Sequence, residues 1–204
     1  MSLVGMLEEN NQIERILTIE EEKRLLDSSI TYLKPIILTA LNTGMRRGEI
    51  LNLKWSEVDF ANNSIMVSQT NSKSKKARKV YINSTLKRLL LELKLKSAGN
   101  EFVFLDEGNP LREIKNGFKA ACRRAGIQGR RFHDLRHTAA TRMIEAGASI
   151  VAVNKILGHS DIKTTMRYTH PEDSVKDALE YLSKFRQTTT KITTTEIADK
   201  INHL

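Results

Sequence analysis

Apolar residues recur at helical spacing along most of the chain, so the sequence predicts a mainly helical protein. Thr18 and Glu21 form a capping box, which predicts that a helix begins there. Ser149 is a candidate cap for a helix that starts at residue 150. Gly44 and Gly158 each follow an apolar helical stretch, in the position where glycine commonly ends a helix. Beyond the helix that starts at Thr18, the expected helices cover residues 32–42, 49–55, 86–96, 111–125, 133–146, 150–157, 161–168 and 171–185.

The spacing of apolar residues changes to a period of two between residues 64 and 82. We expect two strands, at 64–69 and 79–82, joined by a lysine-rich turn, and a short strand at 101–105. The predicted fold class is therefore α+β, mainly helical, with a small antiparallel sheet. A length of 204 residues suits one domain. We divide the chain as follows: an N-terminal lead at 1–17, the main domain at 18–186 and a C-terminal tail at 187–204.

The formal net charge of the chain is +9, and it is concentrated in two segments. Residues 71–80 carry five cations and no acid, and residues 114–136 carry seven cations and one acid. The remainder of the chain is slightly acidic, which favours one phosphate-binding face over two separately solvated basic stretches. The candidate DNA contacts in these segments are Lys75, Lys76, Arg78, Arg123, Arg124, Arg130 and Arg131.

The composition excludes several classes of protein. Cys122 is the single cysteine, which rules out an intramolecular disulfide framework and a cysteine-rich zinc site. No apolar run approaches the length of a membrane span, and no signal peptide opens the chain. We therefore expect a basic cytoplasmic protein without a membrane partner.

His133, Arg136 and His137 stand at positions i, i+3 and i+4 of an expected helix and therefore share one face. The two histidines also have the spacing of the zinc-protease motif His-Glu-x-x-His, with Asp134 in place of the glutamate. Zinc is disfavoured because Asp134 is one methylene shorter than the glutamate of that motif, and because Arg136 would place a cation beside the metal. Both histidines are also compatible with ordinary core positions.

Three further residues carry groups suited to phosphate chemistry. Arg46 follows an expected helix break, His159 follows an expected helix end, and Tyr168 comes nine residues after His159. Each also has a structural explanation, such as an ion pair of Arg46 with Glu49 or simple packing of Tyr168. A phosphodiester transition state needs fixed donors, a nucleophile that can form an ester and an acid for the leaving oxygen. The chain contains candidates for all three.

Four blocks occur in one order: residues 43–51, residues 133–138, residues 157–159 and Tyr168. Together with the lysine-rich hairpin they resemble the catalytic domain of the tyrosine recombinases, the phage integrase family. The resemblance extends from residue 17 to about residue 185. It implies the DNA breaking-rejoining fold of that family, with residues 18–186 as the catalytic domain. Because about 17 residues precede the first matched helix, we expect an isolated catalytic domain without the usual N-terminal DNA-binding domain.

The resemblance implies a role for each matched residue. Arg46 and Arg136 resemble the two clamp arginines, His133 a proton-handling group, and His159 a donor to the phosphate. Tyr168 resembles the nucleophile. Lys73 resembles the hairpin lysine that protonates the 5′ oxygen, because it lies five residues before an arginine at the expected start of the second strand. Supporting positions match Glu49 and His137.

The implied activity is site-specific DNA recombination, in the integration or excision of a phage or mobile element, through a 3′-phosphotyrosyl intermediate. No metal, ATP or other cofactor is expected, because the phosphodiester energy is kept in the covalent ester. The alternatives are a tyrosyl 3′-linking topoisomerase and a module that only binds DNA. The implied partner is double-stranded DNA, with a tetramer on paired sites, a monomer without DNA, and action at the nucleoid of a bacterial host.

Overall fold

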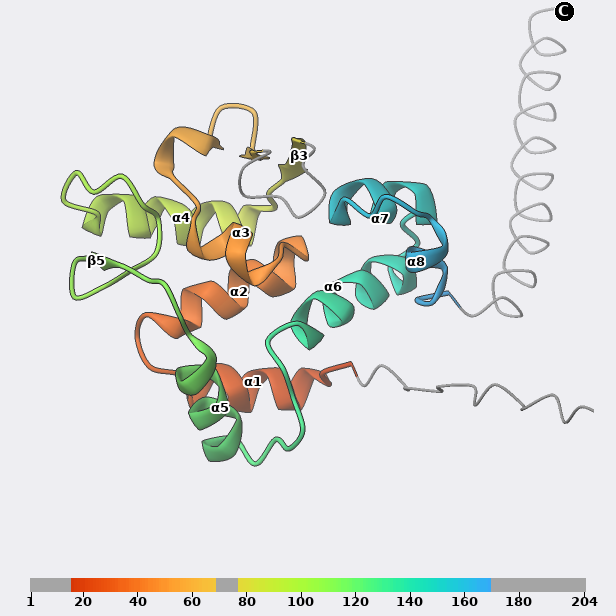
Figure 1. The fold of residues 1–204 in the computed structure, drawn as a ribbon, viewed down its shortest axis with the longest axis horizontal. Coiled ribbons are helices and arrows are strands. Elements are labelled where there is room, and N and C mark those ends of the chain that lie inside the picture. Colours follow the sequence, from red (N-terminus) through yellow and green to blue (C-terminus); the bar gives the residue numbers. More distant parts are fainter. Residues whose placement is uncertain (1–15, 69–76, 170–204) are drawn as a thin grey trace, which may run out of the picture. The chain divides into compact units, whose positions relative to one another are not determined.

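The computed structural model describes residues 16–68 and 77–169 (Figure 1). Its chain divides into two compact units at the boundary between Met166 and Arg167. The fold described here is that of the first unit; of the second, the structure describes only residues 167–169. Among the described residues, no helix is long and apolar enough to cross a membrane.

The first helix, α1 (Ile19–Asp27), begins as the sequence predicts. Thr18 Oγ1 accepts a hydrogen bond from the backbone N–H of Glu21 at 3.1 Å. Glu21 Oε2 in turn accepts one from the backbone N–H of Thr18 at 3.2 Å. The predicted capping box is confirmed, and it satisfies two N–H groups that a helix start leaves without partners.

Helices α2 (Leu33–Thr43) and α6 (Asp134–Glu145) pack against each other and form the centre of the fold (Figure 1). Most residues of α2 are buried, as its largely apolar sequence predicts. The helix ends at Gly44, whose backbone is left-handed with a φ of 64°. The prediction that glycine ends this helix is confirmed, since the left-handed region carries little steric cost for glycine.

A three-stranded antiparallel sheet has the strand order β1-β2-β3. The predicted strands are confirmed as β2 (Ser64–Val67) and β3 (Arg78–Tyr81), which pair from Ser64↔Tyr81 to Val67↔Arg78. A two-residue strand that the sequence did not indicate, β1 (Val58–Asp59), pairs with β2. Helix α4 (Ser84–Lys96) follows β3, close to its predicted bounds.

The prediction of one helix over residues 49–55 is wrong. Helix α3 (Arg47–Leu51) ends early, and a 3₁₀ turn (Trp55–Glu57) follows after a break. The break arises because the backbone there pairs with residues 101–103: Val103 N–H donates to Leu53 O at 2.9 Å. The predicted strand at 101–105 is correspondingly reduced to an isolated bridge and the short hairpin of β4 (Leu105–Asp106) and β5 (Asn109–Pro110).

The remaining helices follow the predicted order. Helix α5 (Lys115–Arg124) is shorter than expected, and α7 (Ile150–Leu157) begins at its predicted cap, Ser149. Gly158 ends α7 with a φ of 68°, and α8 (Lys163–Met166) is a single turn. The predicted helix at 171–185 and the tail at 187–204 lie outside the described residues.

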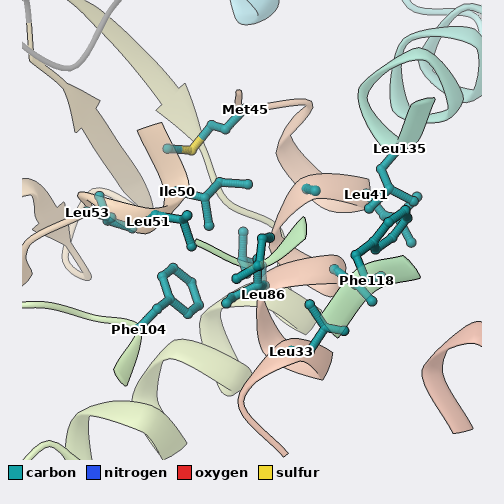
Figure 2. Packing of buried hydrophobic residues seen from close by; sticks show 14 of the residues in the cluster. Leu33, Leu41, Met45, Ile50, Leu51, Leu53, Leu86, Phe104, Phe118 and Leu135 are labelled. Carbon is teal, nitrogen blue, oxygen red and sulfur yellow. The ribbon is translucent and has the colours of Figure 1, made fainter. Parts of the chain in front are cut away.

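The core gathers apolar side chains from α2, α3, α4, α5 and α6 around one centre (Figure 2). Leu33, Met45, Ile50, Leu86 and Phe118 are all nearly inaccessible to solvent. Full burial of each such side chain contributes about 1.5–3 kcal/mol to stability. This core fixes the ends of α2 and α6 relative to each other, and the candidate site lies at those ends.

Candidate functional site

Arg136 lies in α6 with only 2% of its surface exposed, and its guanidinium joins two helix ends. Its Nη1 donates to the carbonyl of Gly44 at 2.6 Å, just after α2. Its Nη2 donates to the carbonyl of Leu157 at 2.8 Å, at the last residue of α7. Carbonyls at the C-terminal end of a helix lack helical partners and carry partial negative charge, so a buried cation is stabilised there.

This double contact brings three of the predicted site segments together. Arg46 follows Gly44 by two residues, and His159 follows Leu157 by two residues. The segments that carry Arg46 and His159 therefore converge on the side chain of Arg136. The fold thus brings together segments that lie far apart in the sequence.

Arg46 lies at the start of α3 and is held by Glu49. The Arg46 backbone N–H donates to Glu49 Oε2 at 2.9 Å, and Arg46 Nη1 donates to Glu49 Oε1 at 3.0 Å. The Glu49 side chain is 1% exposed, whereas that of Arg46 is 23% exposed. The Arg46 side chain is thus partly accessible to solvent, while its hydrogen-bond partner Glu49 is buried.

Glu49 also receives Arg78, the first residue of β3. Arg78 Nη1 and Nη2 donate to the two carboxylate oxygens of Glu49 at 2.9 and 2.6 Å. Burial alone would raise the pKa of Glu49, but the hydrogen bonds and charge of Arg78, with the bonds from Arg46, outweigh it and lower that pKa. Glu49 is therefore ionised near neutral pH, and its carboxylate binds both Arg46 and Arg78.

His133 immediately precedes α6 as its N-cap residue. Its ring lies edge-on to that of His137, with the centroids 4.8 Å apart. Desolvation, followed by the nearby charges of His137 and Arg136, lowers the pKa of His133 to about 4. Its imidazole is consequently neutral near pH 7 and able to accept a proton. The neighbouring His137 is buried.

His159 is oriented by a short chain of hydrogen bonds. Its Nδ1 lies 2.9 Å from Thr165 Oγ1, and Thr165 Oγ1 donates to Asn154 Oδ1 at 2.7 Å. Since the single hydroxyl hydrogen of Thr165 is directed to Asn154, the Thr165 oxygen accepts from His159 Nδ1. When the His159 ring is an imidazolium, its Nε2 can donate a hydrogen bond to an anion.

Two of the predicted DNA contacts have structural roles instead. The Arg78 side chain is 8% exposed in its pair with Glu49. The Arg130 side chain is 2% exposed, with Nη2 bonded to Glu21 at 3.0 Å and to the carbonyl of Ile16 at 2.7 Å. Because each of these guanidinium groups is buried in an ion pair with a carboxylate, we do not retain Arg78 and Arg130 as phosphate contacts. Their burial was not visible in a count of charges.

The other predicted residues comprise exposed arginines, the buried Tyr168 and positions that the structure does not describe. Arg123, Arg124 and Arg131 are exposed, and Arg124 also donates to the carbonyl of Ser28. Tyr168 lies in the turn that follows α8. The lysine-rich turn lies outside the described residues, which concerns Lys73, Lys75 and Lys76. Within the described ranges, no group of three or more His, Cys, Asp or Glu side chains is placed to hold a metal ion.

The buried network that supports the site is not predictable from the sequence pattern. Arg78 was interpreted as a surface cation, and the bond from its Nε to the carbonyl of Ile156 at 2.9 Å was not foreseen. One signal was available, namely two glycines that end helices ahead of candidate site residues. At Gly44 an added Cβ would lie 2.6 Å from Leu157 Cδ2, so glycine there permits the close approach of α2 and α7.

Known proteins of similar sequence and structure place this arrangement in a family. The integrase of Salmonella phage P22 is 32% identical over 184 residues, covering 82% of this chain and 46% of the relative. The shufflon-specific DNA recombinase of Escherichia coli is 32% identical over 161 residues, covering 77% of this chain and 40% of the relative. The chain thus spans less than half the length of these two relatives.

A solved structure of similar extent also matches. The catalytic domain of the bacteriophage HP1 integrase superposes with a TM-score of 0.59 and 31% identity, covering 79% of this chain and 93% of that domain. The family model described as "Phage integrase family" matches residues 8–174. By the family model and by its relatives, the chain belongs to the phage integrase family.

Proposed function

We propose that this chain is the catalytic domain of a tyrosine recombinase that exchanges DNA strands at a specific site through a 3′-phosphotyrosyl intermediate. The observation that carries this proposal is the double hydrogen bond of Arg136 to Gly44 O and Leu157 O. It gathers the segments of Arg46, Arg136 and His159. Their side chains are the kind of hydrogen-bond donor that a phosphoryl-transfer site needs for the non-bridging oxygens.

In the proposed reaction, the Tyr168 hydroxyl attacks the scissile phosphate, the P–O5′ bond breaks, and a 3′-phosphotyrosine forms. Arg46, Arg136 and protonated His159 stabilise the charge on the non-bridging oxygens, and neutral His133 accepts the proton of Tyr168. Lys73 protonates the departing 5′ oxygen. A 5′ hydroxyl from a partner strand reverses these steps, so the number of phosphodiester bonds is conserved and no cofactor is consumed.

Chain continuity supports the choice of Tyr168. Tyr168 follows by three positions Thr165, whose hydroxyl orients His159. A chain advances by at most about 3.6 Å per residue, so the Cα atoms of Tyr168 and Thr165 are within roughly 11 Å of each other. The names of the relatives, an integrase and a DNA recombinase, favour strand exchange over the topoisomerase alternative.

We further propose double-stranded DNA as the partner, with a tetramer assembled on paired sites and a monomer in its absence. The exposed arginines Arg123, Arg124 and Arg131 and the lysine-rich turn provide the cations for phosphate contacts. Such a protein would act in the bacterial cytoplasm, at the nucleoid.

The proposal is tested by incubating the chain with a randomised pool of nicked duplexes in the presence of EDTA. Adducts that survive denaturation in SDS are recovered and their DNA is amplified over several rounds. We expect enrichment of a common duplex sequence, hereafter the selected duplex, with Tyr168→Phe as the control that captures no DNA. Failure to recover any SDS-stable adduct from the wild-type chain would contradict the proposal.

A further inference from the structure

The Glu49 carboxylate is shared unequally between two arginines. Arg78 engages both carboxylate oxygens, at 2.9 and 2.6 Å. Within the described part of the chain, the Arg46 guanidinium reaches only one of them, through Nη1 at 3.0 Å. Bidentate arginine–carboxylate pairs are the stronger kind, so the negative charge of Glu49 is committed mainly to Arg78.

This division preserves the positive charge of Arg46. The net charge of the two guanidinium groups and the one carboxylate is +1. Arg46 is the most exposed of the three side chains, at 23% against 8% for Arg78 and 1% for Glu49. Without Arg78, the buried carboxylate would pair with Arg46 alone and neutralise it. The Arg46 guanidinium would then offer less positive charge to a DNA phosphate.

Arg78 also fixes the end of α7. Its Nε donates to the carbonyl of Ile156 at 2.9 Å, next to the Leu157 carbonyl that Arg136 binds. The next residue is Gly158, where an added Cβ would lie 2.8 Å from Arg78 Cδ and 3.0 Å from Nε. The backbone of α7 therefore approaches the Arg78 side chain as closely as only glycine permits, one residue before His159.

From these contacts we propose that Arg78 is a positioning residue of the strand-transfer site, which keeps Glu49 from neutralising Arg46 and holds the α7 terminus that presents His159. The inference rests on the proposed function. Arg78 itself touches no DNA in this account. It is the first residue of β3, five residues after Lys73, so the same side chain also anchors the strand that leaves the lysine-rich turn.

The test compares single-turnover cleavage and equilibrium binding of the selected duplex by Arg78→Ala, Arg78→Lys and the double variant Arg78→Ala/Glu49→Gln. We expect Arg78→Ala to cleave about 10- to 100-fold more slowly, since small displacements in a site have effects of this size. Its affinity for DNA should stay within about threefold of wild type, because many other cations share the binding. Arg78→Lys keeps the charge, so its cleavage rate should lie between those of the wild type and Arg78→Ala. It also provides a second variant if Arg78→Ala does not fold.

The double variant separates positioning from packing. Glutamine has the shape of Glu49 without its charge, so Glu49→Gln should return at least about fivefold of the cleavage rate that Arg78→Ala loses. A merely structural role of Arg78 would give no such rescue, because the second substitution restores no packing.

Arg142 supplies a matched control. It also joins a carboxylate, Glu22, and a backbone carbonyl, that of Leu17 at 3.1 Å, but it belongs to neither the catalytic nor the DNA-binding set. Arg142→Ala should lower the unfolding midpoint and leave cleavage by the folded protein unchanged. Wild-type cleavage by folded Arg78→Ala, or a rate loss that Glu49→Gln does not relieve, would overturn the inference. Absence of cleavage by the wild-type chain would instead count against the proposed function.

Discussion

Arg136 and Leu157 are joined by a hydrogen bond from the guanidinium Nη2 to the carbonyl oxygen at 2.8 Å, across 21 residues of sequence. With the contact to Gly44, this bond makes one buried arginine the common cap of α2 and α7. In the proposed function this side chain has two roles, one in holding the fold and one in presenting charge to a phosphate. The two roles predict different measurable losses.

Arg136→Lys should reduce both stability and cleavage. Lysine offers a single ammonium in place of a planar fork, so one of the two buried carbonyls loses its partner, at about 1–3 kcal/mol of unfolding free energy. Removal of a transition-state donor lowers the cleavage rate by about 10²–10³-fold. Urea unfolding and single-turnover cleavage of the selected duplex measure the two losses. Cleavage at the wild-type rate by the folded variant would remove Arg136 from the catalytic set.

Arg130 and Arg131 are neighbours in sequence with opposite expected effects. Arg130→Ala should lower stability without changing the salt dependence of DNA binding, because its side chain is buried against Glu21. Arg131→Ala should leave stability unchanged and reduce the slope of log affinity against log salt by about 0.9, the loss of one phosphate contact. The Arg131 side chain is 73% exposed, and its bond to Asp134 is long at 3.4 Å. An unaltered slope for Arg131→Ala, or a reduced one for Arg130→Ala, would contradict this assignment.

The lowered pKa of His133 predicts a dependence of stability on pH. The unfolded chain protonates this histidine near 6.5 and the folded chain only near 4. Between these values the unfolded state binds more protons, so His133 destabilises the fold as pH decreases from about 6.5 to 4. His133→Gln should therefore lose less stability between pH 7 and pH 5 than wild type. An NMR titration of the ring with a midpoint at or above 6.5 would refute the shift.

Lys73 is predicted to be the general acid, on the family resemblance alone. A substrate with sulfur in place of the bridging 5′ oxygen has a leaving group that needs little protonation. Lys73→Ala should cleave normal DNA slowly and the sulfur substrate at nearly the wild-type rate. Lys75→Ala and Lys76→Ala are matched controls that should be equally active on both. If one of them shows the selective defect instead, the assignment within the hairpin is shifted.

The sequence was sufficient for features that depend on local chemistry. The capping box of Thr18 and Glu21, the cap at Ser149 and the glycines that end α2 and α7 were all predicted and are present. Each depends on residues a few positions apart, where backbone sterics and a single hydrogen bond decide the outcome. The order of helices and the pairing of β2 with β3 followed from the same kind of local signal.

Features that depend on distant partners were not predictable. The helix expected over 49–55 breaks because its second half pairs with residues 101–103. Arg78 and Arg130 resemble surface cations in the sequence, and only the fold places Glu49 and Glu21 beside them. Charge type can be read from a sequence, whereas burial of that charge depends on tertiary contacts.

The central claim is that Tyr168 carries the DNA, and peptide mapping of the trapped adduct tests it most directly. Trypsin cleaves after Arg167 and Lys176, so the nucleophile lies in the peptide formed by residues 168–176. The adduct is digested with nuclease and trypsin, and mass spectrometry locates the modified residue. The account predicts a nucleotide linked through its 3′ phosphate to Tyr168 and no adduct from Tyr168→Phe. A nucleotide on another residue, or an adduct that persists in Tyr168→Phe, would contradict it.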